Sequence, residues 1–505
     1  MNRREFLTRA GAVGAMAGVA PGFWRAALSA PAQPGPSPYG ELQAPDANGL
    51  MLPAGFTSRV VATSLTPVPG TTHVWHMFPD GGACVPTDDG GWIYVSNSEN
   101  PPPADVPAGP QLMAELAGAL GEIPLTGGAG AIRFAADGTV VDAYTILAGT
   151  ISNCAGGLTP WGTWLSCEEW EGDDGPTYAA GRVFECDPLG VAPAVERPAL
   201  GVFKHEMAAA DPDRQQLYLS EDQPDGLLYR YTPPPGTWGS GAALEGGALE
   251  AMAVDGTGHV TWLPVPDAAA PTAPLRTSVP GATPFDGGEG VLYDAGLVYL
   301  TTKGDDRVWV HDVAAQTMAV LYDASEHISP VLDGVDNLAI SAAHDLYVAE
   351  DGGNLEVCVI TPERAVFPVA RMTGPQHGFE NPTPVPLISE VTGLALSPDG
   401  NRLYFNSERG MGIGGLPTGP GPGILYEITG PFRGGSLAAE TAAPAGAPGP
   451  APVSATAAPA SGPVAVAGRL PATGRSVGLT GAAAAAAAGA VLLRLRQRVG
   501  RPPSP

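Results

Sequence analysis

One pattern recurs six times along the chain and constrains its fold more than any other feature. Each instance is a turn followed by a short strand with a central aromatic residue, and the strand ends in acidic or amide residues. The central aromatics are Tyr94, Trp164, Tyr218, Tyr299, Tyr347 and Tyr404, which lie 70, 54, 81, 48 and 57 residues apart. Four-stranded propeller blades take about 40 to 50 residues plus loop insertions. The repeats therefore predict an all-β fold, a six-bladed β-propeller.

A potential metal ligand precedes each of these aromatics, directly ahead of a short apolar strand. The six residues are Asp80, Cys154, Glu206, Glu289, Asp336 and Glu390. The innermost strands of a propeller all start at one mouth of the central channel, so we expect these side chains to converge there. Buried carboxylates that lie close together are costly unless cations neutralise them. We therefore expect a metal cluster at the channel mouth, although acidic residues also occur in ordinary polar turns.

A second set of acids follows the aromatic strands and is expected to form an outer ring of ligands. Its members are Glu99, Glu168, Glu221, Glu350 and Glu408. The segment 153–170, NCAGGLTPWGTWLSCEEW, combines a cysteine and two glutamates in one expected hairpin. A thiolate is a soft metal ligand and carboxylates are hard ones, which favours a mixed metal centre. The alternative for this segment alone is a buried cysteine beside a solvated turn.

The N-terminal segment has the features of an export signal. Residues 2–7 read NRREFL, an apolar run of small residues follows, and Ala30-Pro31-Ala32 fits a cleavage site. We expect residues 1–32 to be a twin-arginine signal peptide, with the twin-arginine translocase as partner. This route carries proteins that have already folded, often around a cofactor.

The C-terminal segment has the features of a cell-wall sorting signal. Residues 470–474 read LPATG, and an apolar run and a basic tail follow. This order resembles the signal that sortase cleaves, here between Thr473 and Gly474, before it joins the protein to peptidoglycan. A retained membrane anchor is the alternative, and both place the protein at the surface of a Gram-positive bacterium. Residues 434–469, rich in Ala, Pro, Ser and Gly, are predicted to be a disordered spacer, which leaves residues 41–433 for the propeller.

Charge and cysteine content narrow the class of function. The formal net charge is −26, and the two expected address segments contain nine arginines but only one acid, so the remainder is more acidic still. A field this negative excludes nucleic acid as a partner and favours cation binding. Five cysteines allow at most two disulfides, so at least one thiol is free or a metal ligand.

Several of these motifs resemble the PhoX-type alkaline phosphatases. They are GGAGAIRF (127–134), NCAGGLTPWGTWLSCEE (153–169), KHEMAAADPDRQQLYLSEDQPDGLLYRY (204–231), DGVDNLAI (333–340) and EVTGLALSPDGNRLYFN (390–406). The resemblance implies twin-arginine export, a six-bladed propeller and hydrolysis of small phosphate monoesters. It also implies an iron (Fe³⁺) pair with several Ca²⁺ ions at the channel mouth.

The resemblance also assigns roles to particular residues. It implies that Cys154, Glu206 and Glu289 form the catalytic iron centre, and that Asp336, Glu350 and Glu390 lie on the calcium side. Glu168 and Glu221, from the acidic strand ends, complete the expected metal ligands. One departure concerns the phosphate: the family has an arginine two residues before the glutamate of the fourth blade, and this chain has Gly287 there.

Two other functions remain open from the sequence. Six-bladed propellers with a single divalent metal at the mouth also hydrolyse lactones, although such a site has no need of a cysteine. A non-catalytic surface propeller that holds calcium for rigidity and binds a partner is the second alternative, and the missing arginine is its main support.

Overall fold

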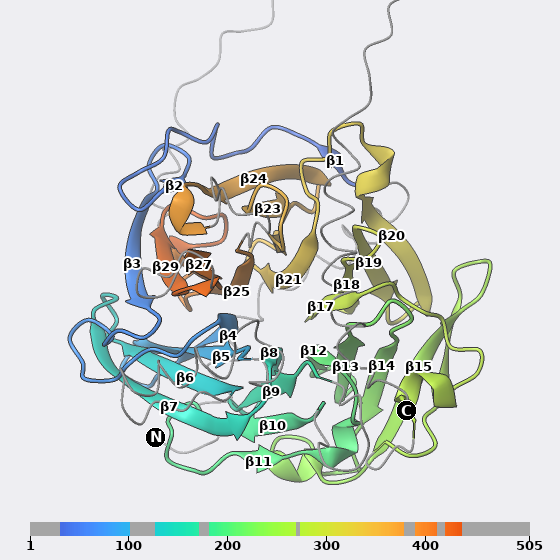
Figure 1. The fold of residues 1–505 in the computed structure, drawn as a ribbon. Coiled ribbons are helices and arrows are strands. Elements are labelled where there is room, and N and C mark those ends of the chain that lie inside the picture. Colours follow the sequence, from blue (N-terminus) through green and yellow to red (C-terminus); the bar gives the residue numbers. More distant parts are fainter. Residues whose placement is uncertain are drawn as a thin grey trace, which may run out of the picture. The chain divides into compact units, whose positions relative to one another are not determined.

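The computed structural model describes residues 31–100, 127–170, 181–268, 273–377, 389–411 and 420–436. These residues all belong to one compact unit, residues 1–441, and six of their seven β-sheets are arranged around a central channel (Figure 1). The predicted six-bladed β-propeller is therefore confirmed. Nearly all of the predicted signal peptide and spacer, and the whole sorting signal, lie outside the described residues.

Each sheet is one blade, and its strands follow one another from the channel outward. Blade 1 contains β4 (Pro79–Pro86), β5 (Trp92–Ser98), β6 (Gly127–Phe134) and β7 (Val140–Thr150), and blade 2 contains β8 (Asn153–Leu158), β9 (Trp164–Glu168), β10 (Val183–Cys186) and β11 (Val195–Glu196). Blade 3 contains β12 (His205–Asp211), β13 (Gln216–Glu221), β14 (Leu228–Thr232), β15 (Ala248–Val254) and β16 (Val260–Pro264). Blade 4 contains β17 (Gly288–Asp294), β18 (Leu297–Thr302), β19 (Arg307–Asp312) and β20 (Thr317–Asp323).

The last two blades also use strands from the N-terminal part of the chain. Blade 5 contains β21 (Val335–Ile340), β22 (Leu346–Glu350), β23 (Glu356–Ile360) and β24 (Ala365–Met372), extended by β1 (Gln33–Pro34) and β2 (Leu50–Met51). Blade 6 contains β25 (Val391–Leu396), β26 (Arg402–Ser407), β29 (Ile424–Thr429) and, outermost, β3 (Thr57–Thr63). A separate two-stranded sheet pairs β27 (Gly410–Met411) with β28 (Pro420–Gly421).

The ring closes where the beginning and the end of the propeller meet. Strand β3 pairs antiparallel with β29, so that Thr63 lies opposite Ile424 and Thr57 opposite Thr429. The inner strands contact one another in the order β4, β8, β12, β17, β21 and β25, and β25 contacts β4. Because β3 covers the edge of β29, blade 6 presents no long unpaired edge there.

The core of the described structure consists of six apolar clusters, one at each blade–blade interface. Both faces of a blade are therefore covered, which explains why the second strands are apolar on both faces rather than alternating. The six aromatics of the sequence repeat lie in β5, β9, β13, β18, β22 and β26 and are all buried. Each blade contains one of them, so the repeats of the sequence are the blades of the fold. The register differs by one residue: the aromatic lies four residues before the partner of the first inner-strand residue in blades 1 and 2, and three residues before it in blades 3 to 6.

Glycines allow the inner strands to approach closely at the channel. A Cβ atom on Gly157 of β8 would lie 1.8 Å from the carbonyl oxygen of Ala208 in β12, and one on Gly81 of β4 would lie 2.3 Å from the Cα atom of Ala155. A side chain at either position would push two blades apart, which explains the glycine-rich inner strands.

The helical elements within the described residues are short 3₁₀ turns, apart from the single residue Ser436 at the end of the last described range. They are η2 (Pro198–Leu200), η3 (Gly241–Leu244), η4 (Leu275–Ser278), η5 (Ala324–Glu326) and η6 (Pro375–His377). Among these residues we find no helix with the length and apolar character needed to cross a membrane. Ala32, the last residue of the predicted signal peptide, is buried, and its N–H donates to the Leu321 carbonyl at 2.6 Å.

Candidate metal centre

Five inner strands present one metal-binding side chain each at the same register position. In every one of these strands the pairing with the second strand shifts directly after the first residue, which marks a β-bulge. Bulges re-aim side chains and are common beside functional sites. The first bulged residues are Asp80, Cys154, Glu206, Glu289 and Asp336, which we call the bulge set; all five are buried.

Blade 6 departs from this arrangement. Its first inner-strand residue, Val391, pairs with Ser407 as Val335 of blade 5 pairs with Glu350, so the position equivalent to Asp336 is Thr392. The Thr392 hydroxyl donates to the Pro79 carbonyl at 2.9 Å and serves blade packing. Glu390 lies two residues earlier and joins a different group of acids. The expected set of six equivalent ligands is thus a set of five in the described structure, with Glu390 beside it.

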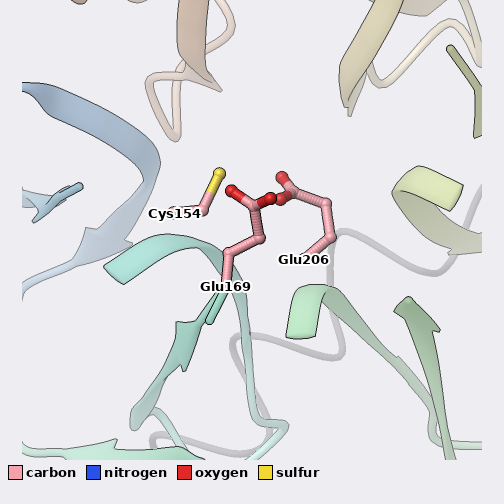
Figure 2. A group of neighbouring side chains, drawn as sticks. All are labelled: Cys154, Glu169 and Glu206. Atoms are coloured by element: carbon pink, nitrogen blue, oxygen red, sulfur yellow. The ribbon is translucent and has the colours of Figure 1, made fainter. Parts of the chain in front are cut away.

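Three groups of side chains at the channel mouth bring ligand atoms within 4.8 Å of one another. Cys154, Glu169 and Glu206 form the first, and Figure 2 shows the sulfur and the two carboxylates pointing toward one another from blades 2 and 3. Glu206, Glu289 and Asp336 form the second, and Asp80, Glu99, Glu390 and Glu408 form the third. Glu206 joins the first two groups, and the Cys154 thiol, 3.3 Å from the Asp80 carboxylate, links the first to the third.

Two observations show that this donor set fits metal ions. Asp80 Oδ1 and Glu206 Oε2 are buried and have no hydrogen-bond partner among the described residues, although buried polar atoms are normally paired. The donors also include both hard carboxylates and a soft thiol. Metal ions would satisfy the unpartnered oxygens and neutralise the charge, which ordinary side-chain hydrogen bonds do not do here.

The acids at the ends of the second strands divide into two kinds. Glu168, Glu221 and Glu350 pair with the first inner-strand residue of their blades, and their carboxylates accept backbone N–H groups of nearby loops. The Glu168 carboxylate accepts from Ile151 and Arg182, that of Glu221 from Leu227, and that of Glu350 from Asp333 and Glu356. The structure therefore does not bring these three predicted ligands into the three groups at the channel mouth.

The next residue along each second strand lies at the mouth instead. These residues are Glu99, Glu169, Asp222, Lys303, Asp351 and Glu408, which we call the strand-end ring. The sequence pattern predicts Glu99 and Glu408 for the outer ring and includes Glu169 in the mixed metal centre of segment 153–170, but it misses Asp222, Lys303 and Asp351. Adjacent residues of a strand point to opposite faces. The distance from the aromatic does not separate the two kinds of acid, because Glu168 follows Trp164 by four residues just as Asp222 follows Tyr218 by four.

Three cations balance part of this negative charge, and two of them are the only lysines in the chain. Lys204 lies 2.6 Å from Glu169 and 2.9 Å from Asp222, and Lys303 lies 2.7 Å from Glu289 and 3.0 Å from Asp351. Arg409 pairs with Glu390 and Glu408. The bulge set, the strand-end ring and Glu390 contain ten carboxyl groups against these three cations.

The excess of carboxyl groups over cations raises the pKa values of several buried groups at the mouth. Burial raises the pKa of Glu206 well above its usual range, and the neighbouring Glu289 carboxyl adds to the rise. Burial likewise raises the pKa of Glu169 to about 8 and of Asp336 to about 7, although Lys204 and Lys303 oppose the change. The pKa of the Cys154 thiol is raised by burial and by Asp80. A bound cation reverses these effects because it favours the ionised forms.

Another acidic group, of Glu350, Glu356 and Cys358, lies within blade 5. Its polar atoms are already engaged, because Arg371 pairs with Glu356, the Glu350 carboxylate accepts two backbone N–H groups, and the Cys358 thiol donates to the Val331 carbonyl. We interpret this group as structural. All five cysteines lie in the described part of the chain, and none forms a disulfide there.

Comparison with known proteins places this site in context. The family model described as "Alkaline phosphatase PhoX" matches residues 118–326, a segment that contains Cys154, Glu206 and Glu289. No curated protein matches the sequence.

Among solved structures, PhoX from Pseudomonas fluorescens in complex with vanadate, a transition state analogue, superimposes with a TM-score of 0.59 and 19% identity, over 81% of this chain and 99% of that one. A gluconolactonase from Xanthomonas campestris matches with a TM-score of 0.39 and 12% identity, over 78% of this chain and 98% of that one. The second score is too low to support a comparison of function. The likeness to PhoX shows the propeller fold, and together with the family match over residues 118–326 it supports a metal-dependent phosphatase, a hydrolase.

Proposed function

We propose that this protein hydrolyses small phosphate monoesters with an iron pair and Ca²⁺ ions at the channel mouth. The observation that carries the proposal is the group of Cys154, Glu169, Glu206, Glu289 and Asp336, which are all buried except the partly exposed Glu169. It joins a thiol to carboxylates and leaves an oxygen of Glu206 without a partner among the described residues. A plain propeller core has no use for such a group. The family match over the segment that contains Cys154, Glu206 and Glu289 supports the same reaction.

The chain's own residues divide the work at this site. Cys154 and Glu206, with Glu169 and Glu289, are the residues we propose to hold iron, because Cys154 supplies the one sulfur among the three ligand groups at the mouth. The all-oxygen group of Asp80, Glu99, Glu390 and Glu408 suits Ca²⁺, which takes oxygen ligands. When bound, the cations would neutralise phosphoryl oxygens and activate water for displacement. The burial of the bulge set keeps bulk solvent from the ligands.

Export and anchoring form a further part of the proposal. The twin-arginine pattern at residues 2–7 and the LPATG sequence with Thr473 and Gly474 support a mature protein that sortase joins to peptidoglycan. Export after folding agrees with a metal centre that is assembled before secretion. Mass spectrometry of the wall fraction tests this part: a peptide that ends at Thr473 and is linked to peptidoglycan is expected, and an intact C-terminus would contradict it.

The catalytic part is tested by activity and metal analysis together. Purified protein supplied with iron and calcium is expected to hydrolyse a generic aryl phosphate at alkaline pH, and chelation is expected to abolish turnover. A protein of full metal content that turns over no member of a panel of phosphate monoesters and diesters would overturn the proposal. Aryl lactones in the same panel, and a metal analysis that returns one divalent ion and no iron, address the lactone-hydrolase alternative.

A further inference from the structure

The strand-end ring has one member that breaks its pattern. In every blade the first residue of the inner strand pairs with one residue of the second strand, and the ring member is the residue directly after that partner. The six members of the ring therefore occupy equivalent positions. Five of these described positions hold a carboxylate, and the position of blade 4 holds Lys303. An ammonium group cannot be a metal ligand while it is charged, so blade 4 contributes something other than a ligand at this point.

The surroundings of Lys303 place its ammonium between the metal ligands and the solvent. Its Nζ lies 2.7 Å from Glu289 and 3.0 Å from Asp351, and its side chain is 35% exposed. Lys204, the other lysine of the chain, is only 12% exposed and is held between Glu169 and Asp222. Of the two lysines at the mouth, Lys303 is therefore the one that a molecule arriving from solvent can reach.

The backbone segment beside Lys303 has no side chain that would block access from solvent to the ammonium group. The Lys303 N–H donates to the Gly287 carbonyl at 2.8 Å, and Gly287 has a φ of +68°, a conformation that disfavours a side chain. A Cβ atom there would lie 3.4 Å from the Asp222 carboxylate and 3.8 Å from the Lys303 Cβ atom. Gly287 and Lys303 therefore lie side by side at the channel mouth. Gly287 has no side chain to offer, so the positive charge at this place comes from Lys303.

The pair between Lys303 and Glu289 must weaken when Glu289 binds a cation, because the carboxylate then shares its charge. A lysine has a flexible four-carbon stem and can turn its ammonium toward a new anion. We propose that Lys303 binds a phosphoryl oxygen of the substrate and so sets the preference of the site for phosphate esters. This inference rests on the proposed phosphatase function and assigns to Lys303 direct contact with the substrate.

Inorganic phosphate is the probe for this role, titrated calorimetrically into metal-loaded protein. Lys303→Met is expected to weaken phosphate binding by about tenfold or more, since hydrogen bonds to charged groups are among the stronger ones. Lys303→Arg keeps the charge and is expected to stay within about threefold of the wild type. Arg307→Met is the matched control, because Arg307 belongs to the same blade, is 34% exposed and pairs with Asp305 and Asp323 rather than with Glu289 or Asp351.

Metal analysis and kinetics complete the test. All three variants are expected to keep the metal content of the wild type, and Lys303→Met is expected to raise KM for an aryl phosphate. Unchanged phosphate binding in Lys303→Met overturns the inference, and so does a loss of metal, which would make Lys303 a counter-ion of the metal site. If wild type and Lys303→Met turn over an aryl phosphate equally, the phosphatase proposal stays intact. If phosphate binding depends on Lys303 but the protein turns over no phosphate ester, only the proposed reaction is overturned. A wild-type protein that binds no phosphate overturns both.

Discussion

Cys154 contributes the one sulfur among the ligand groups described at the channel mouth. Its thiol lies 3.3 Å from Asp80 and within 4.8 Å of ligand atoms of Glu169 and Glu206, so a metal ion here would meet soft and hard donors together. Burial and Asp80 raise the pKa of this thiol, which keeps it protonated without metal at neutral pH. Metal binding must therefore release a proton from Cys154.

Replacement of Cys154 separates its metal role from its packing role. Cys154→Ala is expected to lose iron and phosphatase activity together, while calcium content and the melting temperature of chelator-treated protein change little. Cys186→Ala is the control, because Cys186 is also buried but lies in β10, where its thiol donates to the Phe184 carbonyl at 3.6 Å and packs in the apolar cluster between blades 1 and 2. That variant is expected to keep its iron. Full iron content in Cys154→Ala would show that the thiol is an ordinary core residue.

At the scale of a strand, the end of β9 assigns different tasks to two adjacent glutamates. The carboxylate of Glu168 accepts backbone N–H groups from Ile151 at 3.1 Å and from Arg182 at 3.2 Å, and so joins two loops. Glu169 lies at the mouth, within 2.6 Å of Lys204. The alternation of side chains along a strand separates the two roles.

Substitution of each glutamate by glutamine tests this division. In Glu168→Gln one amide oxygen replaces two acceptors, so one loop N–H faces an NH₂ group, and we expect a loss of about 1–3 kcal/mol in the free energy of unfolding with the metal content unchanged. In Glu169→Gln we expect weaker metal binding without that loss. Urea denaturation of chelator-treated protein and metal analysis measure the two effects. The reverse outcome would place Glu168 in the metal centre.

For the whole molecule, the acids buried at the mouth and at the neighbouring ends of the second strands make metal-free folding sensitive to pH. Burial raises the pKa of Glu221 to about 7 and of Glu350 to about 9, and that of Glu169 rises to about 8 by burial despite Lys204. Since the unfolded carboxyls titrate near 4.3, the folded state binds more protons than the unfolded state between that pH and about 9. The stability of metal-free protein therefore falls as the pH rises through this range.

Metal ions reverse this trend, because they bind the ionised carboxylates and the thiolate. Chelator-treated protein is expected to have a lower melting temperature at pH 8.5 than at pH 5.5, and the gain from added iron and calcium is expected to be larger at pH 8.5. Thermal unfolding followed by circular dichroism at both pH values measures this. Chelated protein that is more stable at pH 8.5 would contradict the expected burial of uncompensated acids.

The six blades and the residues that begin their inner strands were predictable because both follow from local patterns. A turn followed by an aromatic strand can be recognised in a short stretch of sequence, and six copies of this pattern are compatible with few folds. The positions of Asp80, Cys154, Glu206, Glu289 and Asp336 followed from the same spacing. The family resemblance, carried by motifs in blades 1 to 3 and in blades 5 and 6, agrees with the match over residues 118–326.

The choice between neighbouring residues depended on the tertiary structure. Whether Glu168 or Glu169 lies at the mouth, and whether Glu390 or Thr392 occupies the sixth inner position, depends on the register of pairing within each blade. A shift of one residue moves a side chain to the opposite face of a strand, and no local pattern states where that shift occurs. Lys303 became a candidate for the same reason: only the pairing of six separate strands shows that it occupies a position where the other blades carry an acid.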